Sequence, residues 1–254
     1  MTISARTSSL SRSRARLRLL DGFEFEQDGA RVELPLGTQR LVAFLAFHER
    51  PLLRAYVAGC LWLDKSSERS YANLRSALWR LRRPAVGLID CQGHHLRLAA
   101  DVDVDLRHLV RLARSHLDDG GDPTEATVVL LKGDLLPDWY DDWVVVERER
   151  LRQLRLHALE AHCVRLTGCG RFGEAVDVGM AAVSAEPLRE SAHRALIAAH
   201  LAEGNTVEAA RQYVRFRDLA WDELGVEPSR ALIALLAGAI DLDLVDTRGA
   251  ARSA

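Results

Sequence analysis

Arginine side chains are concentrated in one stretch of the chain, residues 66–83, with the sequence SSERSYANLRSALWRLRR. The planar guanidinium group of arginine can donate two parallel hydrogen bonds to phosphate oxygens or to the edge of guanine. At about 3.6 residues per turn, the spacing predicts a helix with one apolar side, made of Tyr71, Leu74, Leu78 and Leu81. The opposite side carries Arg69, Ala72, Ser76, Trp79, Arg80 and Arg83, and the seam carries Arg75 and Arg82. Such a helix is suited to enter a groove of DNA.

The two ends of this helix have their own signals. Ser66 or Ser67 can cap its start, and Pro84 should stop it. A solvated amphipathic helix is the plainer interpretation, because runs of charge are usually just surface. The segments on either side of the stretch therefore decide between the two interpretations.

Short strands and helices surround the basic stretch in a definite order. Residues 17–34 read as short strands, with alternating FEFE and the turn signal Asp28-Gly29. Helices are predicted over residues 38–50 and 53–62, and a hairpin is predicted about a turn at Gln92-Gly93-His94. Sheet, helix, helix, basic helix and hairpin is the order of a winged helix. In that fold the third helix reads the major groove and the hairpin lies on the adjacent backbone.

This order assigns roles to individual side chains. We expect base contacts among Arg69, Ser76, Trp79 and Arg80. We expect phosphate contacts from Arg75, Arg82 and Arg83 and, on the hairpin, from Arg97, and we expect His94 at the tip of the hairpin to contact DNA as well. Trp79 has two interpretations: it contacts a thymine methyl group or a sugar edge, or it packs against a neighbouring protomer.

The charge of the chain is divided unevenly. Residues 1–100 carry 16 basic and 9 acidic side chains, whereas residues 101–254 carry 18 and 27. A basic front half suits nucleic acid and an acidic rear half suits a protein partner. The sequence therefore predicts two domains with different partners.

The rear half reads as helical almost throughout. Helices are predicted over residues 106–117, 124–132 and 144–166. The phrase Gly-xxx-Glu-Ala at Gly170 returns at Gly204, 34 residues later, which is the period of tetratricopeptide helix pairs. We attribute the two glycines to a close approach of helices at the corner of each pair, so that the apolar stripes are buried between pairs.

Several classes of function have no support in the sequence. No run of about 18 apolar residues is present, and the N-terminus lacks the apolar core of a secretory signal, so we expect a cytoplasmic protein with reduced cysteines. His157, His162, Cys163 and Cys169 fit no standard zinc spacing, and we expect neither metal nor cofactor. The acidic cluster at Asp138 to Asp142 lacks a matching base, so we expect no enzyme.

Over roughly residues 17–240, the chain resembles the SARP-type transcriptional activators, the antibiotic regulatory proteins. The resemblance is carried by LRLLDGFEF near the start, CLW at 60–62, NLRSALWRLRR at 73–83, DLLPDWYDDWVVVERERLRQLRLHALE at 134–160 and DELGVEPSRAL at 222–232. Two features depart from the family: the hairpin reads HHLRL where Gly-Tyr-Arg-Leu is common, and Trp79 stands where a small polar residue is common. The chain also lacks the phosphate-binding loop of larger members.

The resemblance implies a mainly α fold with a small β component. An OmpR-type winged helix-turn-helix at 17–101 would be followed by an all-α, tetratricopeptide-like bacterial transcriptional activator domain at 102–242. The residues of the two ends themselves predict disordered tails at 1–16 and 243–254. The resemblance also implies an activator that binds direct repeats in promoter DNA as a pair of protomers and recruits RNA polymerase holoenzyme with its sigma factor, at genes of secondary metabolism. It implies no membrane partner.

The alternative is a helical-repeat adaptor whose DNA contact only tethers it. The aromatic loop Trp139-Tyr140-Asp141-Asp142-Trp143 would then be an anchor for another protein, since Trp and Tyr often dominate interfaces. The competing interpretation is that these aromatic side chains fill the joint between the two domains.

Overall fold

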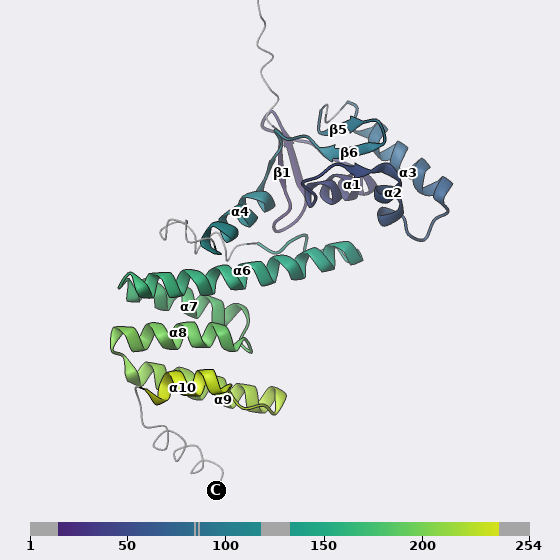
Figure 1. The fold of residues 1–254 in the computed structure, drawn as a ribbon. Helices are drawn as coiled ribbons and strands as arrows, with labels where there is room; N and C mark the ends of the chain where they lie inside the picture. Colours follow the sequence, from purple (N-terminus) through teal and green to yellow (C-terminus); the bar gives the residue numbers. More distant parts are fainter. Residues whose placement is uncertain (1–14, 84, 86, 118–132, 239–254) are drawn as a thin grey trace, which may run out of the picture. The chain divides into compact units, whose positions relative to one another are not determined.

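The computed structural model describes residues 15–83, 85, 87–117 and 133–238 of the 254 (Figure 1). These residues form two compact units. Unit 1 comprises the chain up to His108 together with Gly133–Arg148, and unit 2 comprises Leu109–Lys132 and the chain from Glu149 onward. The tail predicted at 243–254 and the helix predicted at 124–132 lie outside the described residues. So does the tail at 1–16, except for its last two residues, which belong to a strand.

A four-stranded sheet opens unit 1. Its strands are β1 (Ala15–Arg18), β2 (Glu24–Gln27), β3 (Ala30–Arg31) and β7 (Asp103–Val104), in the order β3-β2-β1-β7. β1 and β2 are antiparallel and place Leu17 opposite Phe25, both buried, whereas β7 runs parallel to β1. Asp28 and Gly29 both have positive φ, 54° and 80°, as the tight turn between β2 and β3 requires.

Three helices and a second sheet complete the winged helix. The helices are α1 (Leu36–Ala46), α2 (Arg54–Leu61) and α3 (Ser67–Arg80). The second sheet consists of β4 (Leu52–Leu53), β5 (Ile89–Gln92) and β6 (His95–Leu98), in the order β4-β6-β5. The β5–β6 hairpin turns at Gly93, whose φ of 56° suits glycine. The wing is therefore a hairpin joined through β4 to the start of α2.

The basic helix differs from its prediction in two ways. It ends at Arg80 rather than at Pro84, because Leu81 and Ala85 are buried and the chain turns to bring them inward. Its buried side consists of Ser70, Leu74, Ala77 and Leu81, whereas Tyr71 is 37% exposed. Ser70 can be buried because its hydroxyl donates to the carbonyl of Trp62 at 3.1 Å.

Unit 1 is closed by the start of helix α4 (Asp105–Leu117). The half-buried carboxylate of Asp105 accepts hydrogen bonds from the backbone N–H groups of Leu19, Leu20 and Leu106 at 2.6–3.1 Å. Burial is the main cause that raises the pKa of this carboxyl group, against the effect of the three N–H donors. Strand β7 and the first turn of α4, up to His108, therefore belong to the winged-helix unit.

The chain returns to unit 1 at residues 133–148, here called the return segment. The N–H of Asp21 donates to Asp134 at 2.8 Å, and the N–H of Leu136 donates to Leu19 at 2.9 Å. Helix α6 (Asp142–Gly168) begins in this segment. The predicted domain boundary after residue 101 does not coincide with this division. β7 pairs with β1, and both Asp105 and the return segment bond to residues 19–21 just after β1.

Aromatic and polar side chains fasten the return segment. Trp139 stacks on Phe23 with ring centroids 6.0 Å apart, and Trp143 meets Phe44 edge-on at 5.2 Å. Asp141 forms an ion pair with Arg40. Of the aromatic residues of the loop at 139–143, only Tyr140 is largely exposed, at 84%. The two tryptophans are therefore used for packing inside unit 1.

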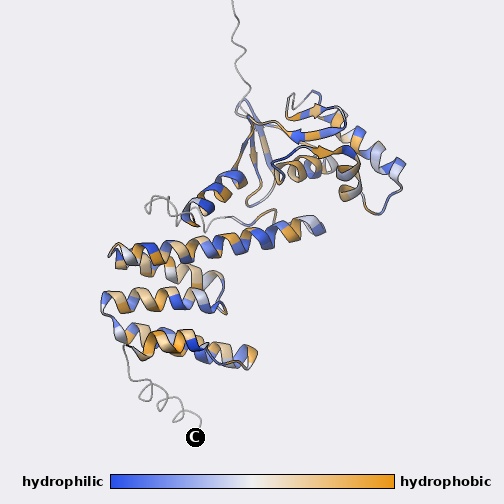
Figure 2. Cartoon of the chain, viewed as in Figure 1, coloured by the Kyte–Doolittle hydropathy of each residue, from blue (hydrophilic) through white to orange (hydrophobic). Residues whose placement is uncertain are grey.

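Unit 2 is a series of antiparallel helices. After α6 come α7 (Phe172–Ala185), α8 (Glu190–Glu203), α9 (Thr206–Leu224) and α10 (Arg230–Ala237). Small residues fill the core between α6, α7 and α8, whereas Tyr213, Phe216 and Leu232 contribute to the core between α9 and α10. α10 is largely hydrophobic along its length (Figure 2).

The repeated glycines have a different role from the predicted one. Gly170 and Gly204 have φ of 74° and 90° and end α6 and α8, and nothing lies within 4 Å of a Cβ added at either position. The close approach is instead at Gly179 on α7, where a Cβ would lie 3.1 Å from that of Leu196 on α8. The period of 34 therefore marks glycines that adopt a left-handed backbone conformation where α6 and α8 end.

The fold class expected from the sequence, mainly α with a small β component, is confirmed. Across the described ranges, no helix combines the length and apolar character needed to cross a membrane. All four cysteines are free thiols.

Candidate nucleic-acid interface

The exposed face of α3 carries most of the candidate residues. At about 100° per residue, Ala72 and Trp79 lie between about 140° and 180° around the helix axis from every buried residue of the helix. Arg75 lies on one flank of this line, and Arg69, Ser76 and Arg80 lie on the other. All of these side chains except the half-buried Ala72 are exposed. The structure therefore gathers the predicted helix residues on one accessible face.

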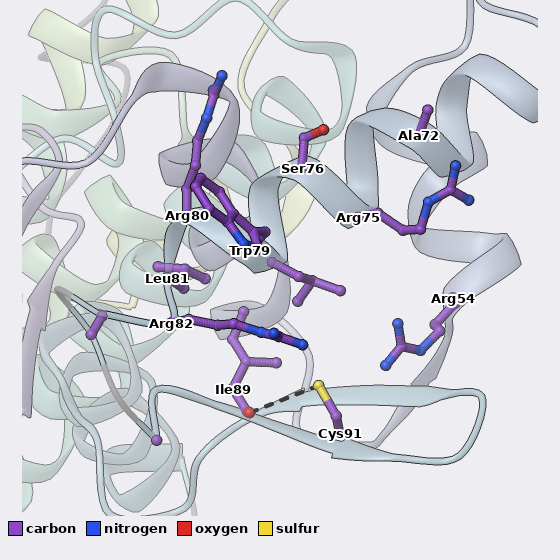
Figure 3. A pocket seen from close by; sticks show the side chains of 13 residues that line it. Arg54, Ala72, Arg75, Ser76, Trp79, Arg80, Leu81, Arg82, Ile89 and Cys91 are labelled. Carbon is purple, nitrogen blue, oxygen red and sulfur yellow. Dashed lines mark hydrogen bonds between the residues drawn. The ribbon is translucent and has the colours of Figure 1, made fainter.

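A groove of about 1000 Å³ runs between α3 and the β5–β6 hairpin (Figure 3). Four arginines line it, Arg54, Arg75, Arg80 and Arg82, and none of the described lining residues is acidic. In Figure 3, Arg82 points into the space between α3 and the hairpin, whereas Arg80 points away from the hairpin. A groove lined by arginines and by no described carboxylate is suited to a polyanion.

Arg54 is the lining arginine that was not predicted from the sequence. Its backbone N–H donates to the carbonyl of His94 at 2.8 Å, which ties the tip of the hairpin to the start of α2. Its Nε is buried, and the described part of the chain supplies no hydrogen-bond partner for it. One signal was available: no carboxylate follows Arg54 before Asp64.

The predicted DNA-binding residues that lie outside α3 differ in their exposure and contacts. Arg82 and Arg83 follow the end of α3 in a turn and are exposed. His94 is exposed at the tip of the hairpin. Arg97 forms an ion pair with Asp90 across the hairpin at 2.9 Å, with the two side chains 40% and 37% exposed. Such an exposed pair contributes little to stability, so it can exchange for a phosphate contact at small cost.

Two of the residues considered for a zinc site, His162 and Cys163, are engaged otherwise, whereas His157 and Cys169 are exposed. The thiol of Cys163 donates to the carbonyl of Ala175 at 3.2 Å, and burial raises its pKa to about 11, so it stays protonated. His162 is buried against Arg165, whose Nη2 lies 3.1 Å from its Nδ1. Within the residues that the structure describes, no three His, Cys, Asp or Glu side chains are placed to hold a metal ion.

Comparison with known proteins gives relatives for both halves of the chain. The regulatory protein AfsR of Streptomyces coelicolor is 29% identical over 203 residues, which is 76% of this chain but 20% of AfsR. The chain thus spans about a fifth of that relative. The structure of Mycobacterium tuberculosis EmbR, solved in complex with a low-affinity phosphopeptide, superposes with a TM-score of 0.68 at 21% identity, over 94% of this chain and 70% of EmbR.

The family profile of the bacterial transcriptional activator domain matches residues 100–238. This range covers more than half of the chain. It includes the return segment and every described helix from α4 onward. The chain therefore belongs to the family of regulators that carry the bacterial transcriptional activator domain, the SARP-type transcriptional activators.

Proposed function

We propose that the chain binds promoter DNA by placing α3 in the major groove, with the β5–β6 hairpin beside it on the sugar-phosphate backbone. The observation that carries this proposal is the groove between α3 and the hairpin, which four arginines and no described acidic residue line. A helix with one exposed, basic face next to such a groove matches the docking geometry of a winged helix.

The position of each side chain decides whether it contacts phosphates or base edges. Arg54, Arg75 and Arg82 stand around the groove and grip phosphates, together with Arg83 and Arg97. Arg69, Ser76 and Arg80 approach base edges from one flank of the exposed face of α3, here called the reading face. Each phosphate contact makes the fall of log affinity with log salt steeper by about 0.9, and each bidentate base contact is worth about 1–3 kcal/mol of discrimination.

The proposal extends to how the protein acts at a promoter. A single small basic unit binds weakly at physiological salt, so two protomers on direct repeats supply the missing affinity through effective concentration. The helical unit 2 then offers its surface to RNA polymerase holoenzyme with its sigma factor, and the regulated genes are those of secondary metabolism. This extension is supported by the family of the chain and by the relation to the regulatory protein AfsR.

The adaptor remains the alternative function. Its predicted anchor loses weight, because Trp139 and Trp143 are packed on Phe23 and Phe44 and only Tyr140 offers an exposed aromatic ring. An adaptor with a tethering contact would bind DNA without sequence preference. DNA binding therefore separates the two functions.

The test is a gel shift and a footprint on DNA upstream of the protein's own gene, at two salt concentrations. Three variants are compared with the wild type: Arg80→Ala on the reading face, Arg54→Ala in the groove, and Arg31→Ala as a control. Arg31 is exposed in the same unit and pairs with Glu24 on the first sheet.

We expect the wild type to protect a pair of direct repeats, Arg80→Ala to lose the footprint, and Arg54→Ala to bind more weakly with a salt slope reduced by about one. Arg31→Ala should behave as the wild type. Binding that ignores sequence, or that all three variants preserve equally, would overturn the proposal and favour the adaptor.

A further inference from the structure

Trp79 is the most exposed large aromatic side chain on the reading face, at 70%. Tryptophan is usually well buried, so an indole left in water on a functional face suggests that a partner covers it. Trp79 lies opposite the buried side of α3, and Ala72, two turns earlier, lies on the same line. Together they make an apolar line along the middle of a basic face.

The surroundings of this line disfavour the same face of a second copy of the chain as the partner. Arg75 and Arg80 lie on either side of Trp79 on α3, and Arg82 follows in the groove. The acidic residue of α3, Glu68, stands eleven positions earlier, about 16 Å along the helix axis. A second reading face would bring arginines against arginines, whereas DNA brings phosphates to the same groups.

The chemistry of the major groove narrows what the indole can meet. The edges of the bases present hydrogen-bond donors and acceptors, and the apolar group among them is the 5-methyl of thymine. The small side chain of Ala72 lets the helix approach the bases closely, and Trp79, which lies opposite the buried side of α3, then faces the bases in the major groove. Building on the proposed function, we propose that Trp79 packs on a thymine methyl group and fixes a thymine at one position of each repeat.

The experiment removes one methyl group at a time. Once a footprint defines the repeats, synthetic duplexes carry deoxyuridine in place of each thymidine in turn, and dissociation constants are measured by fluorescence anisotropy. The wild type is compared with Trp79→Ala, and with Trp79→Phe, which keeps an apolar ring. Circular dichroism checks that each variant retains its helix content and melting temperature.

We expect one thymine position per repeat at which deoxyuridine weakens the wild type about three- to fivefold, the value of one buried methyl group. Trp79→Ala should bind more weakly and be insensitive to deoxyuridine at that position alone, and Trp79→Phe should keep part of the sensitivity. The loss of coupling at one position separates a methyl contact from a general loss of affinity.

Several results would overturn the inference. If no deoxyuridine duplex weakens the wild type, or if Trp79→Ala keeps the full sensitivity, Trp79 does not read a methyl group. If Trp79→Ala weakens binding but no deoxyuridine duplex affects the wild type, Trp79 contacts a sugar. If Trp79→Ala changes the sedimentation of the free protein, Trp79 contacts a neighbouring protomer. A wild type without any footprint would overturn the proposed function itself, and this inference with it.

Discussion

Replacing Arg148 by methionine tests how the return segment is held on the winged helix. From the second turn of α6, the guanidinium group of Arg148 donates to the carbonyls of Leu135 at 3.0 Å, Leu136 at 2.6 Å and Trp139 at 3.0 Å. Leu135 and Leu136 are almost fully buried. Methionine keeps the length of the stem but leaves the three carbonyls without this donor.

The magnitude follows from the three hydrogen bonds. A hydrogen bond from a charged donor contributes about 1.5–3 kcal/mol, but this guanidinium is only partly buried and water can reach some of the freed carbonyls. We therefore expect the free energy that opens the return segment to fall by about 2–4 kcal/mol. Since about 1.4 kcal/mol corresponds to a factor of ten, amides protected by the segment should exchange about 30- to 700-fold faster.

Amide hydrogen exchange measures this opening directly. The reporters are the N–H of Asp21, bonded to Asp134, and the N–H of Leu136, bonded to Leu19. Arg150→Met removes the same charge from an exposed position on the same helix and should leave both reporters unchanged. Unaltered exchange in Arg148→Met would refute the conclusion that this side chain fastens the segment.

Two further predictions concern stability. Gly179→Ala places a Cβ 3.1 Å from the Cβ of Leu196, so overpacking should lower the urea midpoint of unfolding. Gly173→Ala on the same helix meets open space, so its urea midpoint should be unchanged or higher. Equal midpoints in the two variants would contradict the close approach at Gly179. Burial is the main cause that lowers the pKa of His116 and of His193. Near pH 6.5 the two imidazoles bind protons in the unfolded chain but not in the folded chain. The free energy of unfolding should therefore fall as pH drops below about 6.5, by at most about 1.4 kcal/mol per pH unit for each histidine. Urea titrations between pH 5 and 7.5 measure this slope, which should flatten in His193→Asn.

The order of strands and helices was predictable because it is encoded in local signals. Asp28-Gly29 and Gly93 adopt the positive φ that their residue types favour, and they fix the two hairpins of unit 1. The reading face of α3 followed from helical spacing alone. Where a residue's own chemistry sets its conformation, the sequence is a sufficient guide.

Contacts between residues far apart in the chain were not predictable in the same way. Hydropathy places Tyr71 on the buried side of α3, but Ser70 is buried there instead, with its hydroxyl donating to the carbonyl of Trp62. Arg54 joins the groove only because β4 pairs with β6. Asp90 occupies the fork of Arg97 through a cross-strand contact. Each of these depends on a partner that no local pattern specifies.

The discontinuity of unit 1 has a consequence for how the protein is made. The winged-helix unit is finished only when residues 133–148 have been synthesised, 40 residues after His108. At about 5–20 residues per second, the ribosome takes about 2–8 s to cover that distance. During this interval Phe23 and Phe44 lack the tryptophans that cover them. The nascent DNA-binding unit therefore carries an uncovered apolar surface until the return segment leaves the ribosome. Chaperones that bind apolar segments can bind the unit during that interval.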